Sequence, residues 1–127
     1  MTFLDFDFSD VVEPHAVDPD KEYKLRIIDV RQDNDKNGNP YVMPRFEIMD
    51  ETGAKDFTYF MGLPNESMDA KRRNTVLYRI KMFMEAFDLS PNTDPNEWIG
   101  TEGWAILGRE DNDQYGEQNF VKKFVKG

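Results

Sequence analysis

Two runs rich in β-branched and aromatic residues flank an Asn-Gly pair, and this arrangement constrains the fold more than any other feature of the chain. Residues 23–30 precede Asn37-Gly38, and residues 41–49 follow it. Asn and Gly both adopt positive φ at low cost, so this pair between two such runs is typical of a β-hairpin. In the second run the period-2 alternation of strands places Val42 and Phe46 on one face and Tyr41 and Arg45 on the other.

The same turn also begins like a calcium-binding EF-hand loop. The side chains expected at the first, third, fifth and sixth positions of such a loop are all there: Asp33, Asp35, Asn37 and Gly38. The loop needs a bidentate Glu at its twelfth position and a helix before it. Pro44 occupies the twelfth position, and a strand-like run precedes the loop. The pattern therefore favours a hairpin turn over a metal site.

The helical part of the chain follows Gly62 and Pro64. Over residues 69–88 the apolar side chains have the spacing of one helical face: Val76, Ile80, Phe83, Met84 and Phe87. Ser67 is a candidate N-cap, and Ser90-Pro91 ends the segment. We therefore expect one helix that covers a core.

Strand-like segments lie on both sides of this helix. A third strand is expected over residues 56–61, a short helical turn over 96–100, and two further strands over 103–109 and 119–125, with a polar, mobile loop at 111–116. The expected fold class is mostly β: a five-stranded antiparallel barrel with an α-helix between strands 3 and 4. This is the order of the OB-fold.

Composition excludes several classes of site and protein. The chain has 127 residues, no Cys and a single His, so it has no disulfide framework, no thiol nucleophile and no His-based triad or zinc site. No run approaches the ~18 apolar residues of a membrane span, and the N-terminus lacks the basic region of a signal peptide. We expect one domain, no membrane association and a cytoplasmic location.

Signs of catalysis are weak. No phosphate-binding loop, nucleophile elbow or zinc-protease motif is present, and the many carboxylates are scattered over turns. A nuclease-like Mg²⁺ site would need carboxylates converging from strand ends, and the spacing does not show this. We expect a protein that is not an enzyme and uses no cofactor.

The acidic residues are concentrated at the N-terminus. Residues 1–22 hold seven acids and one Lys, a net −6 of the total −9, so residues 23–127 carry only −3. The division expected is an acidic segment, 1–22, and an OB-fold domain, 23–127. The segment alternates aromatic and acidic residues, which fits a flexible segment, an edge strand or a docking peptide for a partner. Its anchors would be Phe3, Phe6 and Phe8.

Rings and cations fall on the strands that an OB barrel uses to bind single strands. Aromatic rings stack on bases and cations follow the phosphates. The candidates are Tyr41, Arg45, Phe57 and Tyr59 on strands 2 and 3, Trp104 and Arg109 on strand 4, and Phe120 and Lys122 on strand 5. For each of Phe57, Trp104 and Phe120 core packing is favoured at least as strongly as stacking, because a small barrel fills its interior with aromatics.

The helix is the most basic element. Lys71-Arg72-Arg73, with Arg79 and Lys81, fits a solvated helical face. If the helix flanks a binding groove, the same residues would guide phosphates toward it, an effect that fades with salt.

With these elements in place, the chain from about residue 23 to 124 resembles the small phage-encoded single-stranded-DNA-binding proteins of OB type. The shared patterns are Tyr23-x-Leu25-x-Ile27, the turn at Lys36-Asn37-Gly38, Phe46-x-Ile48-x-Asp50-x-x-Gly53, the helix after Leu63, Trp98-Ile99-Gly100 and Asn119-Phe120-Val121.

The resemblance implies binding of single-stranded DNA with little sequence preference, without a cofactor, in phage replication or recombination inside a bacterial host. The residues to which it extends this role are Tyr41, Arg45, Tyr59, Trp104, Arg109 and Lys122. One departure is the basic C-terminal end, where such proteins often carry an acidic tail that recruits partners. Recruitment of replication or recombination proteins would then use the acidic N-terminal segment or be absent. The rival hypothesis is an acidic protein-interaction module or DNA mimic that inhibits a host factor.

Overall fold

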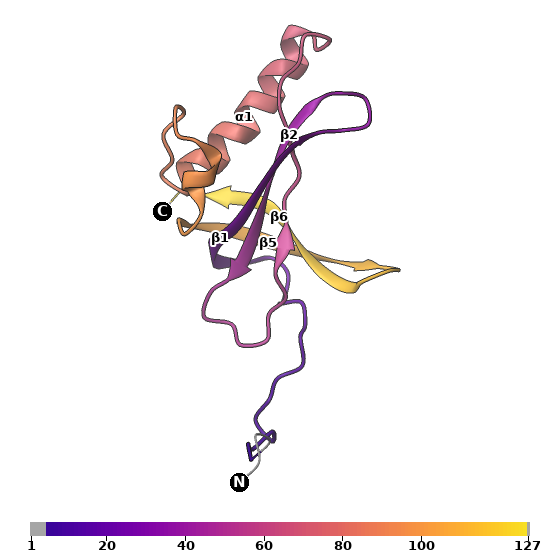
Figure 1. The fold of residues 1–127 in the computed structure, drawn as a ribbon, viewed down its shortest axis with the longest axis vertical. Helices are drawn as coiled ribbons and strands as arrows, with labels where there is room; N and C mark the ends of the chain where they lie inside the picture. Colours follow the sequence, from indigo (N-terminus) through magenta and orange to yellow (C-terminus); the bar gives the residue numbers. More distant parts are fainter. Residues whose placement is uncertain (1–4, 127) are drawn as a thin grey trace.

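A long first strand joins the two halves of the sheet. β1 (Lys21–Asn34) pairs antiparallel with β2 (Pro40–Ile48) on one side and with β5 (Glu102–Asn112) on the other. β5 pairs in turn with β6 (Gly116–Val125), which gives the strand order β3-β2-β1-β5-β6. Figure 1 shows this arrangement in the computed structural model, which describes residues 5–126.

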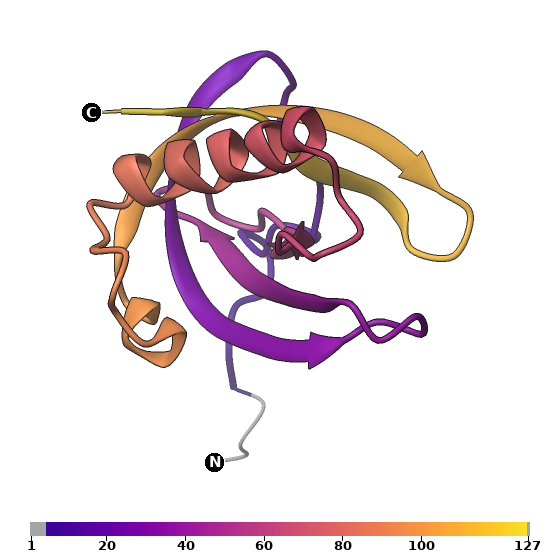
Figure 2. The same cartoon turned by 90° about the horizontal axis from the view of Figure 1, so that it is seen from above.

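The expected fold class is confirmed. The strands curl around a common interior, and α1 (Ala70–Ala86) lies across it, as Figure 2 shows. The helix comes between the third and fourth strands of a five-stranded antiparallel order, which is that of the OB-fold. A short 3₁₀ helix, η1 (Pro95–Trp98), follows α1 at the place where a helical turn was expected.

The third strand is interrupted by a proline on its neighbour. It consists of β3 (Phe57–Thr58) and β4 (Met61–Gly62), which pair with β2 in one continuous register. Pro44 lies opposite the gap, where its carbonyl accepts a hydrogen bond from the Tyr59 N–H (2.9 Å). Because proline has no N–H, it cannot return the second bond of the pair. The strand expected over 56–61 is therefore correct in place but broken in the middle.

Two bulges shape the barrel. The β1–β2 register shifts at Ile28, and the β5–β6 register shifts so that Lys122 has no partner on β5. A bulge bends its strand and changes the direction of nearby side chains. At the second bulge the consecutive residues Lys122 and Lys123 both line the same surface cavity.

The core has Phe46 at its centre. The alternation expected along β2 is confirmed, since Val42, Phe46 and Ile48 are buried while Arg45 is exposed. The Phe46 ring lies within 6.5 Å, between ring centroids, of five other rings, from the third strand, α1, the residue after α1, and β6: Phe57, Tyr59, Phe83, Phe87 and Phe124. The buried residues of α1, Phe83 and Ala86, lie in its C-terminal half, whereas residues 70–75 are all exposed.

The β1–β2 turn is a hairpin, as expected, but with a longer loop. Gly38 has φ of +80°, and Asn37 does not share a positive φ. Instead the Asp35 carboxylate accepts hydrogen bonds from the N–H groups of Asn37 and Asn39, each 2.9 Å long. The carboxylate that would be a ligand in a calcium loop here organises the turn.

The β5–β6 connection differs from the expected loop. The two strands continue as a projecting ribbon to a tight turn at residues 113–115, so most of 111–116 is hairpin. Cross-strand pairs extend the ladder as far as Asn112 opposite Gly116. The Asn112 side chain closes the turn by accepting from the N–H groups of Gln114 and Tyr115.

Asp69, and not Ser67, caps α1. The Asp69 carboxylate accepts from the Arg72 N–H at 2.8 Å, whereas Ser67 bonds to the Asn65 side chain in the preceding turn. A carboxylate at this position also suits the positive end of the helix dipole. Within residues 5–126, the helices are too short or too polar to cross a membrane.

The acidic N-terminal segment joins the fold before the expected boundary at residue 22. Ala16 and Val17 are buried, and the buried Asn119 side chain bonds both the N–H (2.9 Å) and the carbonyl (3.0 Å) of Val17. Residues 5–15 are all exposed, and they pair with the body only through one bridge from His15 to Ala54. Figure 1 shows this part leaving the barrel at the end opposite α1. Of the three anchors expected, Phe3 lies outside the described residues.

Candidate nucleic-acid interface

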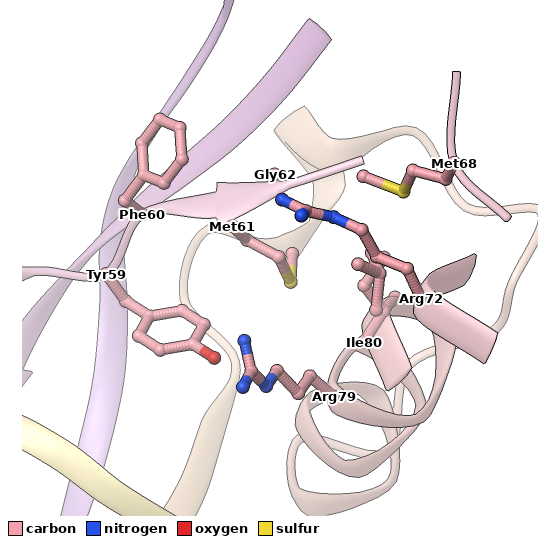
Figure 3. A pocket seen from close by; sticks show the side chains of 9 residues that line it. Tyr59, Phe60, Met61, Gly62, Met68, Arg72, Arg79 and Ile80 are labelled. Carbon is pink, nitrogen blue, oxygen red and sulfur yellow. The ribbon is translucent and has the colours of Figure 1, made fainter. Parts of the chain in front are cut away.

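A groove lies between α1 and the interrupted third strand. Its first part is a cavity of about 250 Å³ between strand residues 59–62 and the α1 residues Arg72, Val76, Arg79 and Ile80. Figure 3 shows the Tyr59 hydroxyl and the Arg79 guanidinium directed toward one another across it, and Arg72 reaching over β4.

A second cavity, of about 470 Å³, continues from the first toward β6. The two share Tyr59, Phe60 and Arg79, and the second adds Tyr78 from α1 and residues 121–124 from β6. We call the two together the α1 groove. It exists because β3 and β6 do not pair within the described sheet, so α1 spans an open seam of the barrel.

The charge of the α1 groove is positive. Its cations are Arg72, Arg79, Lys122 and Lys123, and none of its lining residues within 5–126 is acidic. Lys122 forms an ion pair with Asp20, whereas in the described part of the chain Arg72, Arg79 and Lys123 form none. Three unpaired cations beside apolar walls form a strong site for an anion.

Aromatic rings border these cations. Tyr59 is half-buried, with its ring edge-on to Phe124 at 5.2 Å. Phe60 is 58% exposed and lies 4.9 Å from Tyr41, centroid to centroid, on the outer face of β2. Tyr78 is 58% exposed on α1. Exposed rings beside cations are the combination that binds single strands, since every base has a face that stacks.

The Tyr59 hydroxyl stays neutral at physiological pH. Burial raises its pKa above 10, and the nearby Arg79 charge opposes this rise only in part. A neutral phenol donates a hydrogen bond and adds no negative charge to the groove. The raised folded-state pKa also means that its contribution to stability is full below the unfolded value of about 10 and is lost as the pH rises through the folded value.

Two of the eight expected site residues, Tyr59 and Lys122, line the α1 groove, and Tyr41 borders it through Phe60. Arg45 lies on the outer face of β2, as expected, beside a separate cleft. The stacking role expected for Phe57 conflicts with its position, because the ring is 5% exposed and packs on Phe46. Phe57 belongs to the core.

The remaining three expected residues line neither cavity of the groove. Trp104 is 40% exposed on β5, opposite Lys24 and Val125 in the register. The Arg109 guanidinium lies 3.9 Å from the Asp18 carboxylate, and the Phe120 ring covers the Cα of Gly108, where a Cβ would come within 2.3 Å of it. The structure therefore separates this set from Tyr41, Tyr59 and Lys122.

Sequence reasoning missed two rings of the groove, Phe60 and Tyr78. The sequence did contain a signal for Phe60, because alternation along the third strand places it on the opposite face from Phe57 and therefore outward. Tyr78 lies off the apolar stripe of α1. This position predicts an exposed side chain but does not predict which element the side chain faces.

No protein-family model and no curated protein matches this chain. The features that point to a function are therefore those of the α1 groove.

Proposed function

We propose that this protein binds single-stranded DNA with little sequence preference, without catalysis, along the α1 groove and the outer face of β2. The observation that carries the proposal is the composition of the groove. Three exposed or half-buried rings and four cations line it, with no acidic residue among its described lining. Phosphates would pair with Arg72, Arg79 and Lys123, and each base stacked on a ring contributes ~1–3 kcal/mol.

The overall charge of −9 does not oppose this binding as strongly as its size indicates. Four of the acids, Asp5, Asp7, Asp10 and Glu13, lie within the exposed residues 5–15, and Figure 1 shows this part at the end of the barrel opposite α1. Charges separated by more than the ~8 Å Debye length at physiological salt are largely screened. The local positive field of the groove then dominates the approach of a strand.

The setting that fits the proposal is phage DNA replication or recombination, where the protein would coat and protect exposed strands. This part rests on the resemblance of the sequence to phage single-strand binders. The exposed acidic segment, with Phe6 and Phe8 facing solvent, is available to replication or recombination proteins.

The test is a titration of a dye-labelled oligo-dT at two salt concentrations, followed by fluorescence anisotropy. We expect binding that weakens as salt rises, because each phosphate neutralised on a single strand contributes about −0.7 to the slope of log K against log salt. Three or four contacts give a slope of about −2 to −3. A duplex of the same length should bind more weakly, since its bases are not free to stack.

A second candidate function is an acidic protein-interaction module or DNA mimic that inhibits a host factor. The net charge and the exposed residues 5–15 favour it. The two functions separate in the same titration, because a DNA mimic would not bind oligo-dT even at low salt. That result would overturn our proposal.

Asp20→Asn is expected to raise the affinity for oligo-dT about two- to threefold at low salt, and less at high salt. The carboxylate pairs with Lys122 in the groove, so removing its charge leaves the ammonium free for a phosphate. Asp20 has φ of +67°, a conformation that Asn also tolerates. The readout is the anisotropy titration.

Asp18→Asn is the matched control. It removes the same charge from the same segment, but its partners, Lys21 and Arg109, both lie outside the groove. We expect no gain from it. Equal gains in both variants would show a general charge effect and no specific contact at Lys122.

A further inference from the structure

A further cleft, of about 460 Å³, lies beside residues 56–58, at the opposite end of the third strand from residues 59–62 of the α1 groove. Its walls are the strands β2 and β3 and the β5–β6 turn. The Lys55 ammonium holds this turn in place by donating to the carbonyls of Tyr115 (3.3 Å) and Glu117 (3.0 Å). The cleft is thus a fixed feature of the fold, and we call it the Tyr115 cleft. Its volume lies in the range of sites for small ligands.

The Tyr115 cleft differs chemically from the α1 groove. It holds one cation and one carboxylate side by side, with Arg45 Nη2 at 3.9 Å from Asp56 Oδ2, and both side chains are partly exposed. It also holds the side chains of Gln118 and Asn112. The Asn112 oxygen already accepts from two backbone N–H groups, so its NH₂ group is the part left for a ligand. The cleft therefore offers both donors and an acceptor.

These groups fit a base better than a phosphate. A carboxylate repels a phosphate, so Asp56 makes the cleft a poor continuation of the phosphate path. A base, in contrast, presents donors and acceptors along one edge. The Tyr115 ring is 60% exposed at the mouth of the cleft, where it can stack on a base that enters.

Guanine fits the pair of Arg45 and Asp56 best. Its Watson–Crick edge carries the O6 acceptor beside two donors, N1–H and the N2 amino group. A guanidinium can therefore donate to O6 while the carboxylate beside it accepts from N1–H and the N2 amino group. Cytosine and adenine each offer the carboxylate one donor group on this edge, the amino group, whereas guanine offers two adjacent donors, one for each carboxylate oxygen. Thymine offers the carboxylate a single N–H.

We propose that the Tyr115 cleft binds one guanine base of the bound strand, with Arg45 at O6, Asp56 at N1–H and the N2 amino group, and the Tyr115 ring on its face. This rests on the proposed function and adds to it one position where the protein prefers a base. The α1 groove, which offers only rings and cations, has no such preference.

The test compares oligo-dT strands that carry one dG, dA or dC at the same central position. We expect the dG strand to bind about tenfold more tightly than the dA and dC strands, in keeping with bidentate base contacts. Asp56→Asn should abolish this preference, because an amide offers only one acceptor where the carboxylate offers two. Asp113→Asn is the matched control. Asp113 lies in the β5–β6 turn that borders the cleft, but its side chain is exposed and does not line the cleft. It should keep the preference.

The outcomes of this comparison distinguish a failure of the guanine site from a failure of the proposed function. Oligo-dT binding without any guanine preference would overturn the guanine site and leave the proposed function standing, whereas no binding of any strand would overturn both. Free dGMP, titrated against the unmodified protein and Asp56→Asn, tests the other source of the base. Binding of dGMP that needs Asp56, without a preference in strands, would assign the cleft to a free nucleotide and overturn the strand-bound form. Thermal unfolding of each variant confirms that it is folded.

Discussion

The double variant Arg72→Ala/Arg79→Ala is expected to lose about 10- to 100-fold in affinity for oligo-dT at 0.1 M salt, taking each phosphate contact as roughly a tenfold factor or less. Both guanidinium groups line the α1 groove, and in the described part of the chain neither is paired with a carboxylate. Their removal deletes two phosphate contacts. The slope of log K against log salt should fall in magnitude by about 1.4, at about 0.7 for each phosphate.

Lys71→Ala/Arg73→Ala is the control for this experiment. It changes the net charge by the same amount on the same helix, and the Asp69 cap remains in place. Ala is at least as good a helix former as Lys or Arg, so the helix is not weakened. Neither residue lines the groove. We expect little loss from this pair, and an equal loss from both pairs would show that position on the helix does not matter, which contradicts the groove.

Local sequence patterns predicted the order of elements because each element carries its own signal. Asn37-Gly38 predicted the hairpin, and the alternation along residues 41–48 predicted which side chains of β2 are buried. Some of the details that failed depend on contacts across strands. Pro44, for example, interrupts the third strand because Tyr59 lies opposite it. The longer β1–β2 turn has a local cause instead, the hydrogen bonds that the Asp35 carboxylate accepts within the turn.

The candidate site was predicted less completely, for a physical reason. A pattern can show which residues face outward, but it cannot show which outward faces meet. The basic triplet of the helix illustrates this, since Arg72 lines the groove while Lys71 and Arg73 do not. The position of Lys122 and Lys123 depends on a bulge that no residue type in the sequence predicts. Trp104 and Arg109 are exposed residues of β5, but neither lines a cavity of the α1 groove.

Phe46→Ala is expected to lower the free energy of unfolding by about 3–5 kcal/mol. The side chain is fully buried, and its ring joins β2 to the third strand, α1 and β6 through the contacts with Phe57, Phe83 and Phe124. Removing it leaves a cavity where four elements meet, and rigid strands cannot close in to fill it. Domains of this size have a free energy of unfolding of about 5–15 kcal/mol, so the variant should be close to losing its fold. Urea unfolding followed by circular dichroism measures the change.

Phe60→Ala separates the loss of stability expected for Phe46→Ala from a loss of binding. The same ring is removed, but it is 58% exposed and contacts the Tyr41 ring at the surface, so no interior cavity forms. We expect a change of less than about 1 kcal/mol in the free energy of unfolding, since surface substitutions cost little. Binding of oligo-dT should weaken by the ~1–3 kcal/mol of one lost stacking contact. If Phe60→Ala instead destabilised the fold as much as Phe46→Ala and left binding unchanged, the Phe60 ring would be a structural contact and the strand would take another path.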